Sequence, residues 1–342
     1  MIWVITAATG LFCFLASLWS CGLVRRWLLR RAVLDRPNAR SSHETPVPRG
    51  GGLAVMAPLV LVWLAWAVAG PMPLELALVP VLAALLAAFS FVDDLRGLPA
   101  WSRLLAQAVA VAPMLLLLPP EMALFQGLLP FPVDRILMGL AWLWFINLTN
   151  FMDGIDGISA VEAGTIGLGL LIALALIGLY MEVLAPFAAA ILGVALGFLY
   201  WNRPPARLFL GDVGSIGLGY LIGFLLIALA AAGYWQVALI LPAYYLADAT
   251  ITLGRRALKG EKVWRAHREH FYQRAARAMG GHLPVLRVIG CLNLLLVACA
   301  AYAAACPGKE WRALAFAAVG VAVVLWYFGT ADKRAGHDGR TS

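Results

Sequence analysis

Five aspartates stand where long apolar stretches of the sequence give way to short polar ones: Asp93, Asp94, Asp153, Asp156 and Asp212. Carboxylates that converge at the edge of a low-dielectric region repel one another, so a cluster of them is stable only beside a cation or basic side chains. Mg²⁺ binds carboxylate oxygens together with the phosphate oxygens of substrates. The residue types therefore predict a site for Mg²⁺, or for Mn²⁺ in its place, that handles phosphorylated molecules.

The segment NLTNFMDGIDG, residues 147–157, contains two of these aspartates. In helical register Asp153 and Asp156 are three positions apart and share a face with Asn150. A glycine follows each aspartate, and backbone without a side chain lets N–H groups approach phosphate oxygens closely. A single aspartate at the end of a membrane helix is usually a solvated cap. Aspartates gathered with Asn and Gly at one margin of the membrane instead favour an active site.

A basic segment near residue 260 adds donors for phosphate groups. It contains Arg255, Arg256 and the sequence HREH at residues 267–270, and charge-assisted hydrogen bonds from such residues bind phosphates. A solvated surface is the alternative interpretation of the two histidines. Asp248 lies about one turn or more inside an apolar stretch, where an ionisable residue either serves function or pairs with a structural partner.

These residues must be positioned by membrane-spanning helices. The chain has 342 residues, of which 63% are hydrophobic and 13% are charged, and one span takes about 20 mainly apolar residues. We predict an all-α, polytopic integral membrane protein with eleven transmembrane helices. Residues 1–24 lack the basic region of a cleaved signal peptide and are interpreted as the first span. The predicted spans are 2–24, 52–70, 74–92, 104–119, 136–150, 159–180, 183–201, 213–232, 235–253, 286–304 and 311–329.

The basic residues predict the orientation of these spans. With the N-terminus outside, 23 of the 26 Lys and Arg residues fall in cytoplasmic segments or just inside the adjoining helix ends. The C-terminus and the five aspartates are then also cytoplasmic. The net charge of +8 therefore suits anionic lipid headgroups and phosphorylated substrates, not nucleic acid.

The remaining patterns predict one integral domain over residues 1–342, with residues 254–285 as a cytoplasmic substrate loop. The five cysteines have no metal-binding spacing, and four of them lie in apolar spans, where cysteine behaves as a small hydrophobic residue. Gly193 with Gly197, and Gly219 with Gly223, have the spacing of closely packed membrane helices. Such packing serves either the fold of one chain or a homodimer.

Five segments of the chain resemble the polyprenyl-phosphate N-acetylhexosamine-1-phosphate transferases of glycosyltransferase family 4, which include phospho-MurNAc-pentapeptide translocase. They stand in the family's order, each at a predicted cytoplasmic boundary. The likeness is greatest to the branch that initiates O-antigen or related surface polysaccharides. The segments are RPNARSSHETPVPRGGGLA (36–54), FVDDLRG (91–97), NLTNFMDGIDG (147–157), FLGDVGS (209–215) and HREH (267–270).

The resemblance implies a role for each segment. In the family, the paired aspartates that match Asp93 and Asp94 are essential and face the lipid phosphate. Those that match Asp153 and Asp156 line the nucleotide and metal site, and the histidine loop contacts the sugar nucleotide. The implied catalytic residues are Asp93, Asp94, Asp153 and Asp156, and the implied metal ligands are Asp212 and Asp153. The implied substrate-binding residues are Asn38, Arg49, Asn147, Asn150, Asn202, His267, Arg268 and His270.

The chain departs from the family pattern at two places. Glu269 separates histidines that are commonly adjacent in the family. No lysine follows Asp93 and Asp94 closely, so Arg96 and Arg103 are the basic residues available there. The first departure concerns the sugar contact, and the second concerns the partner of the lipid phosphate.

The implied reaction transfers an N-acetylhexosamine 1-phosphate from a UDP-sugar to undecaprenyl phosphate at the inner face of a bacterial inner membrane, and it releases UMP. Phosphoryl transfer depends mainly on positioning and charge neutralisation. We expect direct attack by the lipid phosphate, oriented by Asp94 or Asp93, instead of an aspartyl-phosphate intermediate. The alternative is an ion-coupled transporter with a carboxylate cation site. A transporter would place acidic residues inside several spans, where the sequence leads us to expect Asp248 alone.

Overall fold

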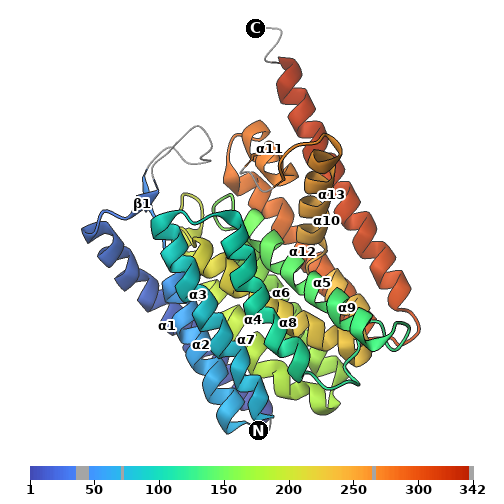
Figure 1. Cartoon of the computed structure of the whole chain (residues 1–342). Coiled ribbons are helices and arrows are strands. Elements are labelled where there is room, and N and C mark those ends of the chain that lie inside the picture. Colours follow the sequence, from blue (N-terminus) through green and yellow to red (C-terminus); the bar gives the residue numbers. More distant parts are fainter. Residues whose placement is uncertain (36–45, 71–72, 264–266, 339–342) are drawn as a thin grey trace.

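The chain, seen here in a computed structural model, is a bundle of long helices (Figure 1). The structure describes residues 1–35, 46–70, 73–263 and 267–338, so the expected site residue Asn38 lies outside the described residues. The long helices are α1 (Ile2–Arg30), α2 (Gly52–Ala69), α3 (Leu78–Arg96), α4 (Ala100–Leu117), α5 (Phe131–Phe151), α6 (Ile158–Ile177), α7 (Ala185–Asn202), α8 (Asp212–Leu229), α12 (His282–Ala305) and α13 (Glu310–Asp338). The shorter elements are β1 (Leu34–Asp35), β2 (Val47–Pro48), η1 (Leu74–Ala77), η2 (Leu179–Leu184), η3 (Ala230–Tyr234), α9 (Trp235–Ile240), α10 (Ala243–Leu258) and α11 (Phe271–Ala278).

Within the described residues, ten helices are long and apolar enough to cross a membrane. This confirms the prediction of an all-α, polytopic membrane protein. The predicted span 136–150 is part of the longer helix α5, which begins at Phe131 with a proline in its first turn. Proline is accommodated there because the first N–H groups of a helix have no partner within it.

One predicted span differs from the observed structure. The range 235–253 is divided between α9 and α10, because Pro242 lacks the N–H donor that a continuous helix would need. Before this break, η3 joins α8 to α9 across a kink at Gly233, whose φ is +97°. In Figure 1, α10 leads back to the end of the bundle that holds α11. Helix α1 begins at the other end, where α13 also starts before it rises to the side of α11 (Figure 1).

The polar loops of the predicted site gather at the end of the bundle that carries β1 and α11, the upper end in Figure 1. We call it the basic end and define it by residues 31–35, 46–51, 97–99, 152–157, 203–211, 259–263 and 267–270 together with α11. The strands β1 and β2 pair antiparallel there, with Leu34 opposite Pro48. The basic end is the margin that the distribution of Lys and Arg predicts to be cytoplasmic.

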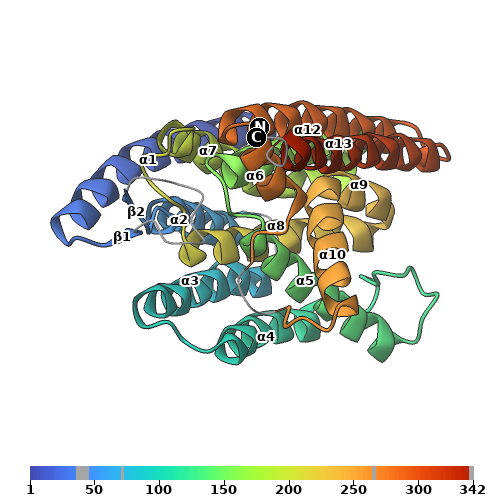
Figure 2. The ribbon, with the colours of Figure 1, turned by 90° about the horizontal axis from the view of Figure 1, so that it is seen from above.

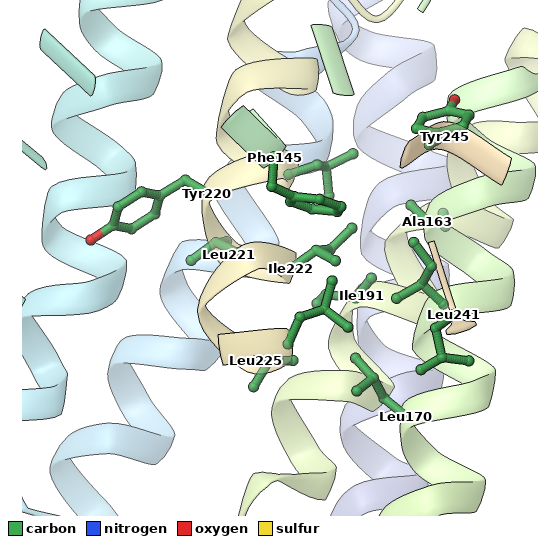
Figure 3. Close-up of a cluster of buried hydrophobic side chains, with 14 of the residues drawn as sticks. Phe145, Ala163, Leu170, Ile191, Tyr220, Leu221, Ile222, Leu225, Leu241 and Tyr245 are labelled. Carbon is green, nitrogen blue, oxygen red and sulfur yellow. The ribbon is translucent and has the colours of Figure 1, made fainter. Parts of the chain in front are cut away.

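Helix α8 forms the centre of the bundle. All of its residues from Val213 to Leu229 are buried, as expected for a helix that is apolar on every side, and other helices surround it (Figure 2). Leu221, Ile222 and Leu225 of this helix belong to the buried cluster drawn in Figure 3. Because α8 begins at Asp212, the packing of this helix in the core fixes where Asp212, one of the predicted metal ligands, lies along the axis of the bundle.

The two glycine pairs are used within the chain. Gly193 and Gly197 face α1, where a Cβ on Gly197 would lie 2.6 Å from the carbonyl oxygen of Phe14. Gly219 and Gly223 face α5 in the same way, with added Cβ atoms 3.0 and 2.7 Å from its atoms. These stripes therefore pack helices of one chain together, and the homodimer remains a prediction that they do not support.

Candidate active site

Backbone pairing joins two segments of the basic end that are distant in sequence. The N–H of Phe209 donates to the carbonyl oxygen of Pro48 at 2.9 Å. In return, the N–H groups of Gly51 and Gly52 donate to the carbonyl oxygens of residues 209 and 210, both at 2.8 Å. The segment PRGGG is thereby aligned with the segment FLGDVGS.

The first turns of α2 and α8 touch backbone to backbone. A Cβ on Gly52 would lie 2.6 Å from Cα of Gly214, and one on Gly214 would lie 2.8 Å from Cα of Gly52. No side chain fits in either place without moving a helix. Gly211, with φ of +75°, makes the turn into α8. The glycines of both motifs therefore serve to place Arg49 beside Asp212.

Two arginines neutralise three carboxylates in this region. Nη2 of Arg49 lies 2.6 Å from Oδ1 of Asp212 and 2.9 Å from Oδ1 of Asp94. Nε of Arg103 lies 3.2 Å from Oδ2 of Asp93, and its Nη1 lies 3.4 Å from Oδ2 of Asp212. We call these five residues the Arg–Asp cluster. It brings together three of the aspartates expected in the site, and Arg49 and Arg103 take the basic role for which the sequence offers no lysine.

Asp153 lies in the turn that follows α5, within electrostatic reach of the Arg–Asp cluster. Ser159 at the start of α6 donates a hydrogen bond of 2.7 Å to its Oδ1. Burial raises the pKa of Asp153 to about 6, the bond from Ser159 and the charge of Arg49 oppose the rise, and the charges of Asp212 and Asp94 add to it. The charges of the Arg–Asp cluster therefore act on Asp153, which makes it a candidate for a fourth carboxylate of the site.

The oxygens of this site suit a divalent cation chemically. Oδ2 of Asp94 is buried without a hydrogen-bond partner, and the backbone at Gly211 comes so close that a Cβ there would lie 3.2 Å from this oxygen. Mg²⁺ prefers such carboxylate oxygens. As the side chains stand, however, the described residues include no group of three or more His, Cys, Asp or Glu arranged to hold one ion. Arg49 supplies the positive charge between Asp94 and Asp212 instead.

The second aspartate of the DGIDG segment has structural partners. Oδ2 of Asp156 accepts a hydrogen bond of 2.9 Å from the N–H of Ala206, and its Oδ1 lies 3.2 Å from Nδ1 of His282. Nearby, Asn202 is 4% exposed and binds the N–H of Gly157 and the carbonyl oxygen of Leu208. These contacts hold the loop after α7 against the turn after α5, so a substrate role for either residue is a prediction that the structure does not support.

The helical register predicted for residues 150–156 is wrong, because α5 ends at Phe151. Asn150, still in the helix, donates to Oγ of Ser215 on α8 at 2.9 Å. Asn147 donates to Oε1 of Gln107 on α4 at 2.6 Å. The two asparagines therefore fix α5 between α8 and α4 near the basic end.

Asp248 is the anchor of the loop that precedes α11. It is fully buried, and its carboxylate accepts the N–H groups of Phe271 and Tyr272, both at 3.1 Å. It also lies 3.1 Å from Nδ1 of His270 and accepts the hydroxyls of Tyr244 and Thr252 at 3.0 and 3.2 Å. Of the two roles left open for Asp248, the structural one is realised. His270 is 2% exposed, so its expected substrate contact gives way to this buried pair.

His267 is the more accessible histidine of the loop. Its ring stacks on that of His270 at 4.9 Å. Burial lowers the pKa of His267 to about 4, and the nearby His270 and Arg256 add to the effect. Glu269, the residue that interrupts the histidines, lies 2.5 Å from Nη1 of Arg256. Arg268 accepts a hydrogen bond from Arg277 through its carbonyl oxygen, which ties the loop to α11.

Glu162 is an acidic residue inside the predicted span 159–180, and hydropathy alone did not single it out. It lies on α6, is 2% exposed and accepts a hydrogen bond of 2.7 Å from Asn293 of α12. Asp248 is therefore not the only acidic residue within a span, which corrects the expectation above. The sequence signal that could have identified Glu162 is a single charged residue in an otherwise apolar stretch.

An apolar cavity lies beside the site. It has a volume of about 730 Å³ and is bounded by α4, α5 and α10, helices that lie next to one another in Figure 2. Asn147 and Phe151 line it at the end of α5, and Gly254 and Ala257 line it on α10. The cavity is thus suited to a hydrocarbon chain whose polar end reaches the basic end.

Comparison with known proteins shows similarity to one family of membrane transferases. Residues 76–230 match the profile of glycosyl transferase family 4. The probable undecaprenyl-phosphate N-acetylglucosaminyl 1-phosphate transferase of Bacillus subtilis is 28% identical over 263 residues, which cover 74% of this chain and 72% of that protein. The phospho-N-acetylmuramoyl-pentapeptide-transferase of Synechococcus is 31% identical over 64% of each chain. The decaprenyl-phosphate N-acetylglucosaminephosphotransferase of Mycobacterium tuberculosis is 27% identical over 83% of this chain and 78% of that protein.

Proposed function

Because the chain belongs to glycosyl transferase family 4, we propose that it transfers an N-acetylhexosamine 1-phosphate from a UDP-sugar to undecaprenyl phosphate and releases UMP. The names of its relatives describe transfer of phosphosugars to polyprenyl phosphates. Membership in this family favours the transferase over the ion-coupled transporter. The initiation of O-antigen or another surface polysaccharide is the pathway that we propose for the product.

The observation that carries the proposal is the Arg–Asp cluster. Arg49 precedes α2, Asp93 and Asp94 end α3, Arg103 lies in α4 and Asp212 begins α8, yet all five meet through ion pairs of 2.6 to 3.4 Å. Convergence of charges from four separate helix ends is costly for folding unless a charged ligand is handled there. Arginine forks match the geometry of phosphate oxygens.

We propose that Asp212 and Asp153 hold a Mg²⁺ ion, with Mn²⁺ as a substitute, and that the unpaired oxygen of Asp94 adds a further ligand. The bound ion would neutralise pyrophosphate charge during transfer. Arg49 is the residue that must release its carboxylates for this to happen. Its guanidinium is then available to bind a phosphate group of either substrate.

The proposed chemistry is a direct displacement. An oxygen of undecaprenyl phosphate attacks the β-phosphorus of the UDP-sugar, a new P–O bond forms, and the bond to the oxygen of UMP breaks. The second pKa of a phosphate monoester is about 6, so the nucleophile is mostly ionised at pH 7. Asp93 orients this phosphate through Arg103, while Arg49, once released from Asp94 and Asp212, holds its charge.

The two substrates approach from different environments. We propose that part of the prenyl chain occupies the apolar cavity between α4, α5 and α10, because its lining is almost entirely hydrocarbon and it reaches Asn147 near the site. The UDP-sugar enters from water at the basic end, where His267 and Arg268 are partly exposed. The excess of Lys and Arg at this end supports the proposal that it faces the cytoplasm from the inner membrane.

The decisive experiment uses the purified full-length protein with undecaprenyl phosphate and a panel of radiolabelled UDP-N-acetylhexosamines. We expect a Mg²⁺-dependent lipid product with one or more of these donors and one equivalent of UMP. Asp212→Asn should abolish it, whereas Glu121→Gln, at the exposed outer end, should not. Absence of product with every donor would overturn the function. Normal activity of Asp212→Asn would remove the metal assignment alone.

A further inference from the structure

Glu162 has one carboxylate oxygen without a partner. It is the fifth residue of α6, lies three residues after Ser159 and is 2% exposed. Its Oε2 accepts the hydrogen bond from Asn293, but its Oε1 is buried with no hydrogen-bond partner in the protein. A buried polar atom of this kind is costly, so a partner outside the protein is expected.

A small enclosed cavity adjoins this residue. Its apolar wall includes Phe145 and Ile222, which are drawn with Tyr245 in Figure 3. The polar residues that line it are Thr149, Ser159, Glu162 and Tyr245. It offers water about 10 Å³ of room, close to the smallest volume that holds a single molecule. The surface of the cavity is mostly apolar, but the polar residues at its wall and the unpartnered Oε1 of Glu162 can supply the two or more hydrogen-bond partners that one ordered water needs.

The cavity is connected to Asp153 by hydroxyl groups. Ser159 gives its only hydroxyl proton to Oδ1 of Asp153, at 2.7 Å. The hydroxyl of Tyr245 lies 3.4 Å from Oγ of Ser159, so Tyr245 must be the donor in that pair. The oxygen of Tyr245 is then left as an acceptor at the wall of the cavity.

We propose that this cavity binds one ordered water molecule, which joins Glu162 to Tyr245, and that Glu162 is thereby a positioning residue for Asp153. The chain of contacts runs from Glu162 through the water, Tyr245 and Ser159 to the carboxylate. Asn293 of α12 fixes the far end by holding Oε2 of Glu162. The argument for the water site uses the cavity and the unpartnered oxygen of Glu162 and does not depend on the proposed function. The expected effect on turnover does rest on the proposed function.

The position of Asp153 explains why such support is needed. Asp153 is in the turn between α5 and α6, not in a helix, so its side chain is not oriented by helical packing. A catalytic group that is displaced by about 1 Å can cost as much as about 100-fold in rate. A fully bonded network buried behind the site restricts the carboxylate to one orientation.

Kinetics of four variants test the positioning role. In Glu162→Leu the water loses its partner, and we expect kcat to fall about tenfold or more while KM for both substrates changes less than about twofold. Glu162→Gln keeps a side-chain oxygen and should retain kcat within about threefold. Tyr245→Phe breaks the chain without adding bulk and should match Glu162→Leu. Ser17→Ala removes a buried hydroxyl that bonds Val194 between α1 and α7, and it should leave kcat unchanged.

Wild-type kcat in Tyr245→Phe would overturn the positioning role, even if Glu162→Leu fails to fold. The water site has its own test, a cryo-electron microscopy map of the wild type at a resolution that shows buried waters. One density peak within hydrogen-bonding distance of Glu162 is expected, and an empty cavity would refute the site. This map is informative even if no sugar phosphate is transferred, so failure of the proposed function is separable from failure of the water site.

Discussion

Nη2 of Arg49 lies 2.6 Å from Oδ1 of Asp212, although 163 residues separate the two in the chain. The same nitrogen lies 2.9 Å from Oδ1 of Asp94. One guanidinium thus bridges two motifs that contribute carboxylates to the site. Nη2 has two N–H groups held in the plane of the guanidinium, one available to each carboxylate, whereas the ammonium group of lysine is a compact point charge on a flexible stem.

Arg49→Lys should therefore keep the charge but lose the bridge. We expect kcat/KM to fall about tenfold, which corresponds to about 1.4 kcal/mol of transition-state stabilisation. Steady-state assays of sugar-phosphate transfer measure this. Arg96→Gln is the matched control, since Arg96 is exposed at the end of α3. An equal loss in both variants would show that only the overall charge of the basic end matters.

The two aspartates of the DGIDG segment should respond differently to removal of their charge. Asp153→Asn preserves the acceptor for Ser159 but removes the negative charge, and we expect kcat to fall at least about 100-fold without any loss of thermal stability. Asp156→Asn still accepts the N–H of Ala206 but loses the pair with His282, so we expect lower stability, by about 1–3 kcal/mol, and kcat within about threefold. Similar rate losses in the two variants would argue against this division.

The rate should decrease in mild acid because Asp153 takes up a proton. Its pKa of about 6 means that the carboxylate form is lost as the pH falls from 7 to 5. Because this pKa lies above that of an unfolded chain, the metal-free protein should become more stable over the same interval. His267, with a pKa of about 4, stays neutral there. The pH–rate profile of His267→Gln should keep the acidic limb, and its disappearance would reassign the limb to His267.

Asp248→Ala should detach the loop that precedes α11. The change leaves the buried N–H groups of Phe271 and Tyr272 and the ring of His270 without their acceptor. We expect a loss of about 3–5 kcal/mol in unfolding free energy and faster proteolysis between residues 259 and 270. Tyr244→Phe, which removes a single donor to Asp248, should cost far less. Wild-type protease resistance in Asp248→Ala would contradict the anchoring role.

Filling the apolar cavity should weaken lipid binding selectively. Gly254 lines this cavity, and a Cβ added there meets nothing within 4 Å. Gly254→Leu is therefore expected to fold normally and to raise KM for undecaprenyl phosphate about tenfold, with KM for the UDP-sugar unchanged. Cys291→Leu, on an exposed position of α12, controls for added bulk. A rise in KM for the UDP-sugar alone would place the nucleotide in this cavity.

Hydropathy was sufficient to predict most of the helices, because each span needs a long apolar segment whatever its neighbours are. Hydropathy failed to predict the break within residues 235–253, where Pro242 separates α9 from α10. The polar side of α10 carries Asp248 and Arg256. Hydropathy also led us to overlook Glu162, since one acidic residue hardly changes the mean of an apolar window. The break and the buried acid were both visible as residue types, but their effect depends on tertiary contacts.

The composition of the site was easier to predict than the direction of its side chains. Asp93, Asp94 and Asp212 meet as expected, because the ends of their helices lie at one margin of the bundle. The partners of Asp156 and His270 could not be foreseen, since spacing along the chain does not specify which of two nearby loops a side chain faces. The bridging position of Arg49 depends in the same way on the pairing of residues 48–52 with residues 209–210.

The contact between Gly52 and Gly214 has a consequence for hybrid proteins. Because the first turns of the two helices are in backbone contact, residues 46–54 and 209–215 form one structural unit that can be exchanged only as a whole, despite their distance in the gene. A chimaera that takes one of these segments from a relative must take the other as well. Otherwise the guanidinium of Arg49 and the carboxylate of Asp212 will no longer be aligned.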